Sequence, residues 1–255
     1  MGRYDGILLL TDFDGTLYTG YEIPQRNIDA IGRFCAEGGK FGFSSGRTHR
    51  YFREWEGVIR PNTCISAING TLIYDYPRGE IVSEKFLPDG AFEKTLRICR
   101  EFEDYYNVAV FRRGSVDTLD FGVDGLESDL RSMMSDPVYK VMFHSRHNIT
   151  DSEKREIEGI FGSDYYVSRS WASGVEIQSR DSTKGEAARF IKSLTGADLL
   201  VCAGDYENDE TMIAAADIGY AVANAVDKVK AVADRQTVSV GEGAIAAIID
   251  ELGSL

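Results

Sequence analysis

Two aspartates near the amino end of the chain are the residues best suited to chemistry. Asp12 and Asp14 directly follow a short apolar run at residues 6–10, which has the length of a strand buried on both faces. Two carboxylates at one strand end repel each other unless a proton or a cation lies between them. Mg²⁺ prefers oxygen ligands and keeps coordination positions for a phosphate and for water. One carboxylate could then attack a phosphorus atom while the other moves a proton.

The glycine after these aspartates supports the same interpretation but does not decide it. Gly15 allows a tight turn that brings backbone N–H groups close to anionic oxygens. Asp and Gly are also ordinary turn residues after strands, so this segment alone leaves a purely structural role open. Other segments must decide between the two interpretations.

Ser45 and Lys184 are the next candidates, and each has a simpler explanation as well. Ser45 follows a short apolar strand at residues 41–43 and could donate a hydrogen bond to a phosphoryl oxygen, although serines commonly cap loops. Lys184 precedes a helical pattern and could hold a carboxylate and a phosphate together, although a single lysine usually lies on a solvated face. Neither assignment is strong by itself.

A third group of polar residues follows the apolar strand expected at residues 199–203. Asp205 could complete a magnesium shell or merely cap the next helix. Asn208 could donate a hydrogen bond to phosphate, and Asp209 could orient Lys184 or a metal-bound water. Ligands of parallel sheets bind at the carboxyl ends of the strands, which is where Ser45, Asp205 and the first two aspartates occur.

Short apolar strands and amphipathic helices alternate at both ends of the chain. The first part predicts strands at residues 6–10 and 41–43, a helix after Pro24 and a helix over residues 51–59. The last part predicts helices and strands in turn: a helix with a possible capping box at Thr183 and Glu186, a strand at 199–203, a helix around 212–213, a strand at 218–222, a helix from about 225 and a final helix around 245–252. This order predicts a doubly wound parallel α/β sheet.

The middle of the chain has a different pattern. It predicts a helix around residues 92–99, a strand at 108–111, a long polar stretch and a strand at 138–143. A helix follows behind a second possible capping box, Thr150 and Glu153, and then two strands at 165–168 and 175–178. Strands joined by short antiparallel links suggest an α+β module inserted into the α/β domain.

Composition limits the classes of protein that the chain can belong to. Its 255 residues carry a net charge of −13, which argues against nucleic acid as a general partner. No apolar stretch is long enough to span a bilayer, and an acidic residue precedes the short first apolar run, so we expect neither membrane insertion nor export. The cysteines are widely spaced without a CxxC pair and favour buried thiols in a reducing compartment, which predicts a cytoplasmic protein: Cys35, Cys64, Cys99 and Cys202.

Taken together, the polar segments resemble the motifs of the haloacid dehalogenase superfamily of phosphotransferases. Its first motif, DxDGT, is present as Asp12-Phe13-Asp14-Gly15-Thr16. Its second, a Ser or Thr at the end of a strand, matches Ser45-Gly46-Arg47, and its third, a Lys before a helix, matches Thr183-Lys184-Gly185. Its fourth, GDxxND, matches Gly204-Asp205-Tyr206-Glu207-Asn208-Asp209. Four motifs in the family's order are a strong signal, whereas any one alone is not.

The resemblance implies a phosphatase mechanism. Asp12 would form an aspartyl phosphate, and Asp14 would protonate the leaving alcohol and then activate water. The carboxylates of Asp12 and Asp205 and the backbone carbonyl of Asp14 would bind Mg²⁺. Asp209 would not bind the ion directly but would orient Lys184 or a metal-bound water. A carboxylate at position 14 favours a phosphatase or a phosphomutase over an ATPase or a dehalogenase. The implied substrate-binding residues are Ser45, Gly46, Arg47, Asn69, Gly70, Lys184 and Asn208.

The resemblance covers the whole chain and is closest to the Cof-type subgroup, which carries a type IIB cap. It implies a Rossmannoid catalytic core at residues 1–86 and 180–255 and an inserted α/β cap at 87–179 that selects the substrate. Asn69-Gly70 resembles the subgroup's core loop that faces the cap, and Val175-Glu176-Ile177 resembles its exit from the cap. One departure is Ala221-Val222-Ala223-Asn224-Ala225, where the subgroup more often has Met-Gly before Asn-Ala; it concerns the pocket wall near Asn224 and not the fold.

The leading interpretation is a Mg²⁺-dependent phosphatase for a small phosphorylated metabolite such as a sugar phosphate, acting as a monomer or homodimer. A phosphosugar mutase and a catalytically idle phosphometabolite-binding protein are the alternatives. His144 and His147 are better explained by packing or solvation than by a metal. Residues that could contact the leaving group are candidates by type alone, and most are expected to be ordinary surface residues: Arg112, Arg113, His144, Arg146, His147, Arg169 and Trp171.

Overall fold

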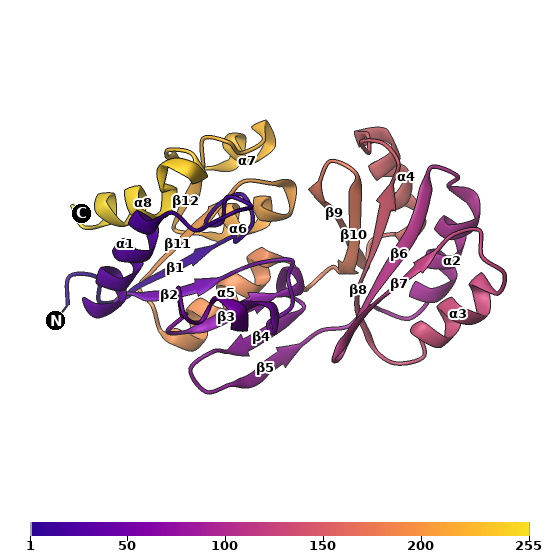
Figure 1. Ribbon diagram of the computed structural model, residues 1–255, viewed down its shortest axis with the longest axis horizontal. Coiled ribbons are helices and arrows are strands. Elements are labelled where there is room, and N and C mark those ends of the chain that lie inside the picture. Colours follow the sequence, from indigo (N-terminus) through magenta and orange to yellow (C-terminus); the bar gives the residue numbers. More distant parts are fainter. Residues whose placement is uncertain (1, 255) are drawn as a thin grey trace. The chain divides into compact units, whose positions relative to one another are not determined.

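The computed structural model describes residues 2–254, which form two compact units (Figure 1). The core unit comprises the chain up to Ser83 and from Thr183 onward, and the inserted unit comprises Glu84–Ser182. Each unit has its own hydrophobic core.

The core unit is built on a five-stranded parallel sheet with the strand order β13-β12-β11-β1-β2. Its first elements are β1 (Ile7–Thr11), α1 (Gln25–Ala36), β2 (Lys40–Phe43) and the 3-10 helix η1 (Tyr51–Trp55). After the inserted unit come α5 (Lys184–Thr195), β11 (Leu199–Gly204), η3 (Glu207–Asp209), α6 (Glu210–Ala215), β12 (Ile218–Ala221), α7 (Asp227–Val232), β13 (Arg235–Gln236), η4 (Val240–Glu242) and α8 (Ala244–Leu252).

Helices cover both faces of this sheet because its central strands are apolar on both sides. Leu9 of β1 belongs to the cluster formed with α1 and α8. Its neighbours Leu8 and Leu10 belong to the opposite cluster, formed with α5 and α6. Successive strand residues point to opposite faces, so a continuous apolar run needs cover on both sides. The predicted doubly wound α/β fold is therefore confirmed.

A small antiparallel sheet in the core unit was not predicted. It contains β3 (Cys64–Ala67), β4 (Leu72–Asp75) and β5 (Glu80–Glu84), with the turn η2 (Ile68–Gly70) between the first two strands. A parallel bridge between Ser44 and Ser66 places β3 next to the chain that leaves β2. These strands have four or five residues each and mix polar with apolar side chains, so they lack the periodic signal of a longer strand.

The helix expected over residues 51–59 was wrong in its extent. Only the 3-10 helix η1 forms, and Val58 is exposed. Gly57 disfavours helix continuation, and Pro61 lies just beyond it. The aromatic residues that suggested a longer helical face instead pack into a cluster around Phe13.

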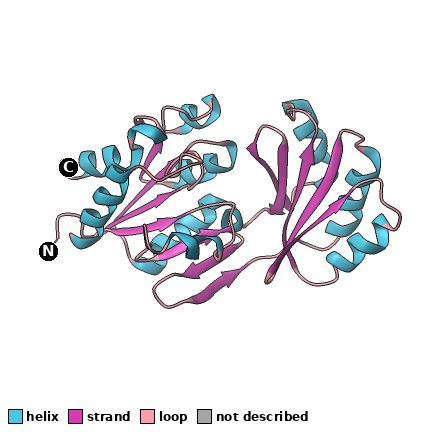
Figure 2. Ribbon diagram, in the orientation of Figure 1, coloured by secondary structure: helices cyan, strands magenta, loops and turns pink. Residues whose placement is uncertain are grey.

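The inserted unit is an antiparallel sheet of five strands, in the order β7-β6-β8-β10-β9, with helices on one face (Figure 2). Its elements are α2 (Ala91–Glu101), β6 (Tyr105–Arg112), β7 (Ser115–Asp120), α3 (Leu126–Met133), β8 (Val138–Ser145), α4 (Asp151–Phe161), β9 (Tyr165–Trp171) and β10 (Gly174–Ser179). The expected long polar stretch after residue 111 was wrong, because it contains β7 and α3. Residues of β7 are at most half-buried and α3 buries only Leu130, so both lack a strong apolar pattern.

Thr150 and Thr183 are the N-cap residues of α4 and α5. At α4 the Thr150 side chain accepts a hydrogen bond from the backbone N–H of Glu153, and the Glu153 side chain accepts one from Thr150, which confirms the capping box. At α5 Thr183 accepts the corresponding bond from Glu186, but the Glu186 carboxylate pairs with Arg189 instead. The α5 cap is therefore half of the predicted motif.

Between residues 2 and 254 no helix combines the length and the apolar character needed to cross a bilayer. All four cysteines are free thiols. Burial raises the pKa of Cys35 to about 11, as expected for an unreactive thiol.

Candidate active site

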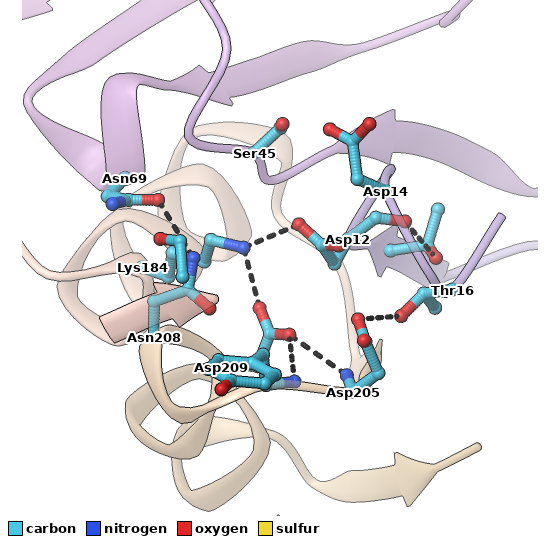
Figure 3. A network of polar contacts seen from close by, with 12 residues as sticks. Asp12, Asp14, Thr16, Ser45, Asn69, Lys184, Asp205, Asn208 and Asp209 are labelled. Atoms are coloured by element: carbon cyan, nitrogen blue, oxygen red, sulfur yellow. Dashed lines mark hydrogen bonds and ion pairs between the residues drawn. The ribbon is translucent and has the colours of Figure 1, made fainter. Parts of the chain in front are cut away.

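Polar residues from four distant segments meet at one edge of the parallel sheet (Figure 3). Asp12 follows β1, Ser45 lies two residues after β2, and Asp205 follows β11. Lys184 is the first residue of α5. Because β1, β2 and β11 are parallel neighbours, their carboxyl ends lie at the same edge, where ligands of such sheets bind.

The segment that carries the first two aspartates is anchored by the residue between them. Phe13 is fully buried and packs edge-on against aromatic rings of η1 and β2, with centroid distances of 5.2 Å to Phe52 and 5.5 Å to Phe43. The backbone N–H of Asp12 donates a 2.9 Å hydrogen bond to the carbonyl of Ala203 on β11. These contacts fix the backbone on both sides of Asp12.

A buried lysine joins two of the aspartates. Lys184 Nζ lies 2.6 Å from Asp12 Oδ1 and 2.6 Å from Asp209 Oδ1, and its side chain is fully buried. Burial alone would lower the pKa of Lys184, but the two carboxylates outweigh it and raise that pKa above its ordinary value. Lys184 is therefore a fixed positive charge beside Asp12.

Asp209 organises the loop after β11. Its Oδ1 accepts the bond from Lys184, and its Oδ2 accepts backbone N–H bonds from Asp205 at 2.9 Å and Tyr206 at 3.1 Å. Both oxygens are thus occupied by the protein itself. This arrangement suits the predicted supporting role better than direct coordination of a metal.

Asp205 also lies near Asp12 and is held by the first motif. Thr16 Oγ1 donates a 2.9 Å hydrogen bond to Asp205 Oδ1. Gly15 has φ +83°, and a Cβ there would lie 2.5 Å from Asp205 Oδ2, so this position requires glycine. Burial, then the neighbouring Asp209, raises the pKa of Asp205 to about 7.

The cluster of carboxylates fits a divalent cation. Oxygens of Asp12, Asp205 and Asp209 lie within 4.8 Å of one another. Burial and neighbouring carboxylates raise the pKa of Asp12 despite Lys184, so one lysine does not balance the negative charge. Within residues 2–254, neither Asp12 Oδ2 nor Asp205 Oδ2 accepts a hydrogen bond. These two uncommitted carboxylate oxygens, on the buried Asp12 and the partly buried Asp205, are the kind of donors that Mg²⁺ prefers.

The predicted phosphate-binding residues form a second part of the site. Ser45 is buried, and its backbone N–H donates a 2.9 Å hydrogen bond to the Ser66 carbonyl. Figure 3 draws its side chain above Asp12. Asn208 Nδ2 donates a 3.2 Å hydrogen bond to Asn69 Oδ1, and a Cβ at Gly46 would lie 3.1 Å from the same oxygen. Gly70 follows Asn69 with φ +100°. The structure therefore brings these residues together with Lys184.

The backbone before Gly70 has an unusual conformation. Ile68 has φ +51° and Asn69 has φ +57°, the only two non-glycine residues between 2 and 254 with positive φ. A β-branched residue in this region is strained, and such strain persists only where the surroundings enforce it. The strain places the Asn69 side chain against Asn208 and Gly46.

Asp14 and Arg47 do not join the Lys184 network. Arg47 Nε and Nη2 each donate a 2.9 Å hydrogen bond to a different oxygen of Asp14. Asp14 is drawn apart from the hydrogen bonds that link Asp12, Lys184 and Asp209 (Figure 3). Arg47, expected as a phosphate ligand, is thus paired with the second aspartate of the first motif.

Several residues of the inserted unit were candidates by type alone, and the structure gives them partners within that unit. Arg113 bonds Glu84, and Arg112 bonds Asp117 at 2.6 Å. His144 lies 2.5 Å from Asn107 Oδ1, and His147 Nε2 lies 2.8 Å from Glu153. The remaining candidates also have neighbours there: Arg146 bonds the Glu103 carbonyl, Arg169 bonds Asp151, and Trp171 packs against His144.

Two residues at the site were not assigned a role from the sequence. Thr16 lies inside the first motif, and its hydroxyl position next to the Gly15 turn was the available signal for its bond to Asp205. Asn224 Nδ2 donates to the Gly15 carbonyl at 2.8 Å, while its Oδ1 accepts from Val240 N–H at 2.9 Å. Asn224 therefore ties the first motif to the segment after β13, in the region where the sequence departs from the Cof-type pattern.

Comparisons with known proteins agree with this geometry. The profile of the haloacid dehalogenase-like hydrolases matches residues 9–249. "Putative phosphatase YxeH" of Bacillus subtilis strain 168 is 29% identical over 96% of this chain and 97% of its own. The 5-amino-6-(5-phospho-D-ribitylamino)uracil phosphatase YitU of the same organism is 23% identical over 97% of this chain and 98% of its own.

Solved structures share the fold over nearly the full chain. One is described as a haloacid dehalogenase subclass IIB sugar phosphatase; it superposes with a TM-score of 0.81 at 19% identity, covering 97% of this chain and 99% of its own. At that identity the similarity establishes the fold and leaves the substrate open.

Proposed function

The chain belongs to the haloacid dehalogenase-like hydrolases, and on that premise we propose that it is a Mg²⁺-dependent phosphatase acting through an aspartyl phosphate on Asp12. The observation that carries the proposal is the environment of Asp12. Its Oδ1 is fixed at 2.6 Å by a buried lysine, while its Oδ2 faces no hydrogen-bond donor within residues 2–254. A carboxylate with one restrained and one uncommitted oxygen can act as a nucleophile or a metal ligand.

The reaction consists of two substitutions at phosphorus. In the first, a carboxylate oxygen of Asp12 forms a bond to phosphorus as the bond to the leaving alcohol breaks, and Asp14 gives its proton to that alcohol. In the second, a water oxygen attacks phosphorus while Asp14 takes a proton from the water. The bond between phosphorus and Asp12 then breaks and releases inorganic phosphate.

The other residues stabilise charge and hold the reacting groups. Lys184 lies beside the nucleophile and can contact a phosphoryl oxygen while it retains Asp209. Ser45 and Asn208 can donate hydrogen bonds to the same phosphoryl group. When bound by Asp12, Asp205 and the backbone carbonyl of Asp14, Mg²⁺ would supply the positive charge that the carboxylate cluster lacks.

We further propose that the substrate is a small phosphomonoester, such as a sugar phosphate, and that the inserted unit selects it. The relatives named above as phosphatases support this class, and one neighbouring structure is described as a sugar phosphatase. The free thiols favour a reducing compartment, so we place the enzyme in the cytoplasm. We also propose that it acts as a monomer or homodimer.

The test is hydrolysis of p-nitrophenyl phosphate and of a panel of sugar phosphates with and without Mg²⁺. We expect Mg²⁺-dependent phosphate release by the native protein and a loss of at least about 10³-fold in Asp12→Asn, which lacks the nucleophile. Asp29→Asn, an exposed change on α1, is the matched control and should retain full activity. Unchanged turnover in a folded Asp12→Asn variant refutes the assignment. Sugar-phosphate isomers in place of free phosphate would indicate a mutase.

A further inference from the structure

We propose that Arg47 is a positioning residue for Asp14: it holds the carboxylate that transfers the proton, rather than the phosphoryl group. The inference rests on the proposed function, because it assigns Arg47 a role in the first substitution at phosphorus. Its starting observation is a two-point contact between the guanidinium and the carboxylate. Arg47 Nε bonds Asp14 Oδ2 and Arg47 Nη2 bonds Asp14 Oδ1, both at 2.9 Å. Two parallel bonds fix the plane of the carboxylate as well as its distance.

The guanidinium is itself held from a second direction. Its central carbon lies 4.6 Å from the ring centre of Tyr51, within the range of a cation–π contact. The Tyr51 ring packs edge-on against Phe13, with a centroid distance of 5.9 Å and an interplanar angle of 84°. Phe13 is the residue between the two aspartates. A chain of contacts therefore runs from the backbone of the first motif through Tyr51 and Arg47 back to the Asp14 side chain.

The backbone of Arg47 is also tied to the rest of the site. Its N–H donates to Ser45 Oγ at 3.2 Å, and its carbonyl accepts from Ile68 N–H at 2.9 Å. These two hydrogen bonds fix the Arg47 backbone between Ser45 and the strained turn before Gly70. The fixed backbone and the contact with Tyr51 together direct the Arg47 side chain toward Asp14.

The pair is tight in geometry but accessible to solvent. The side chains of Arg47 and Asp14 are 48% and 43% exposed. Half-exposed ion pairs open at little cost, because water replaces the lost contacts. One of the two hydrogen bonds can therefore be given up during catalysis. The released oxygen takes up a proton from solvent before the chemical step and gives it to the leaving alcohol as the bond between phosphorus and that alcohol breaks. The second bond keeps the carboxyl group oriented.

A contact between Arg47 and the phosphoryl group would have a different kinetic signature. Losing a phosphoryl contact lowers kcat/KM for every phosphomonoester by a similar factor. Losing the orientation of the proton donor matters only where the leaving group needs that proton. An alkyl phosphate has a poor leaving group and needs it, whereas p-nitrophenolate leaves readily without it. The comparison uses kcat/KM because this constant covers steps up to departure of the leaving group and excludes hydrolysis of the phosphoenzyme.

The experiment measures kcat/KM of the full-length protein with Mg²⁺ on glycerol 3-phosphate and on p-nitrophenyl phosphate. We expect Arg47→Met to lose about 10- to 100-fold on the alkyl phosphate and less than about 3-fold on the aryl phosphate. Arg47→Lys, which can keep one hydrogen bond, should recover part of the loss. Tyr51→Leu should show a smaller loss with the same dependence on leaving group, and Tyr51→Phe, which keeps the ring, should not. Arg189→Met removes an equally exposed ion pair on α5 and is the matched control.

A double variant provides the decisive comparison. The Asp14→Asn variant lacks the proton donor. Adding Arg47→Met to it should therefore lower kcat/KM on glycerol 3-phosphate by less than a further factor of about 2. An equal loss on both substrates, a full further loss in the Asp14→Asn background, or no loss in Arg47→Met overturns the positioning role. Absence of phosphatase activity in the native protein would instead overturn the proposed function. Melting temperatures of Arg47→Met and Arg189→Met show whether a loss reflects misfolding.

Discussion

At the scale of single residues, the site is defined by an imbalance of charge. Three clustered carboxylates, those of the buried Asp12 and Asp209 and the partly buried Asp205, share one lysine, which among them contacts only Asp12 and Asp209. Burying charges is costly unless opposite charges or hydrogen bonds compensate them. Asp209 is compensated by Lys184 and two backbone N–H groups, whereas Asp12 and Asp205 each keep one oxygen without a donor within residues 2–254.

Without a divalent cation, the protein should lose stability as the pH rises from about 5 to 8. Asp205 has a pKa of about 7 when folded against 3.8 as the ordinary value, so the folded state binds more protons in this interval. Stability from that protonation is present at low pH and is lost as the pH passes through 7. The expected loss is on the order of 2 kcal/mol, measured as a fall in melting temperature in EDTA. Mg²⁺ should restore most of it at pH 8.

Asp205→Asn isolates this effect. The amide cannot ionise, so the difference between pH 5 and pH 8 should shrink in this variant. Burial lowers the pKa of His144, so the titration of His144 raises stability with pH over part of the interval. This contribution is the same in the native protein and in Asp205→Asn. A pH dependence in EDTA that is the same for the native protein and Asp205→Asn would contradict the charge imbalance.

Replacing Lys184 by methionine should destabilise the metal-free protein strongly. The change removes the only cation that contacts Asp12 and Asp209 within residues 2–254 and leaves two buried carboxylates facing each other. Breaking a buried ion pair from one side costs about 3–5 kcal/mol. Urea unfolding measures the change. Lys192 lies on the same helix as Lys184 and forms a half-exposed ion pair with Asp217, outside that helix. Lys192→Met should cost less than about 1 kcal/mol. Similar values for the two lysines would show that Lys184 is not structural.

At the scale of secondary-structure elements, the position of Lys184 depends on how closely α5 approaches α6. Gly185 is the second residue of α5, and its N–H donates to Thr211 Oγ1 at 3.1 Å. A Cβ on Gly185 would lie 2.3 Å from the backbone oxygen of Thr211. Backbone cannot move aside as a flexible side chain can, so the helix itself would have to shift. Lys184 would move with it.

Gly185→Ala should therefore destabilise the protein by about 1–3 kcal/mol and lower phosphatase activity. Gly32→Ala is the matched control, because Gly32 lies in the middle of α1 with no atom within 4 Å of an added Cβ. Alanine at this position should stabilise by about 0.5–1 kcal/mol, because it favours a helix more than glycine does. Chemical denaturation of both variants tests the difference in sign. A neutral Gly185→Ala would mean that α5 and α6 separate readily.

Elements with a strong apolar pattern were predictable, and elements without one were not. The continuous apolar runs at residues 6–10 and 199–203 correctly predicted β1 and β11, because strands covered on both faces need such runs. β7 is an edge strand with a half-exposed face, and β3 to β5 are short, so local sequence contained little to identify them. The aromatic residues of η1 were misread as a helical face because their partner, Phe13, is distant in sequence.

The same distinction applies to the site. The motifs predicted that Asp12, Lys184, Asp205 and Asp209 would meet, because each marks a strand or helix end at one edge of the sheet. The pairing of Arg47 with Asp14 could not be predicted, because it depends on side-chain directions set by Tyr51 and the turn at Ile68. From residue type alone, an arginine at position 47 is as well suited to contact a phosphate as to contact the Asp14 carboxylate.

At the scale of the whole molecule, the site belongs entirely to the core unit. Each proposed catalytic, metal-binding or phosphate-binding residue lies before Ser83 or after Ser182. The inserted unit has its own apolar cluster between α2, α3, α4 and its sheet, and the core unit has two clusters of its own. Lys85 Nζ lies 3.2 Å from the Asp181 carboxylate, so the chain enters and leaves the inserted unit at neighbouring points. A domain with these properties can be removed without cutting the core of its host.

A core-only variant, with Ser83 joined to Thr183 by a short Gly-Ser linker, should therefore fold and retain chemistry. We expect cooperative unfolding and Mg²⁺-dependent hydrolysis of p-nitrophenyl phosphate that is abolished by Asp12→Asn. The loss relative to the full chain should stay within about 100-fold, because the nucleophile, lysine and carboxylates are all kept, while contributions from orienting the substrate are lost. The ratios of kcat/KM between different sugar phosphates should fall toward unity, because the unit proposed to select the leaving group is absent. If the core-only variant keeps the native order of preference, selectivity resides in the core unit, and the role proposed for the inserted unit is wrong.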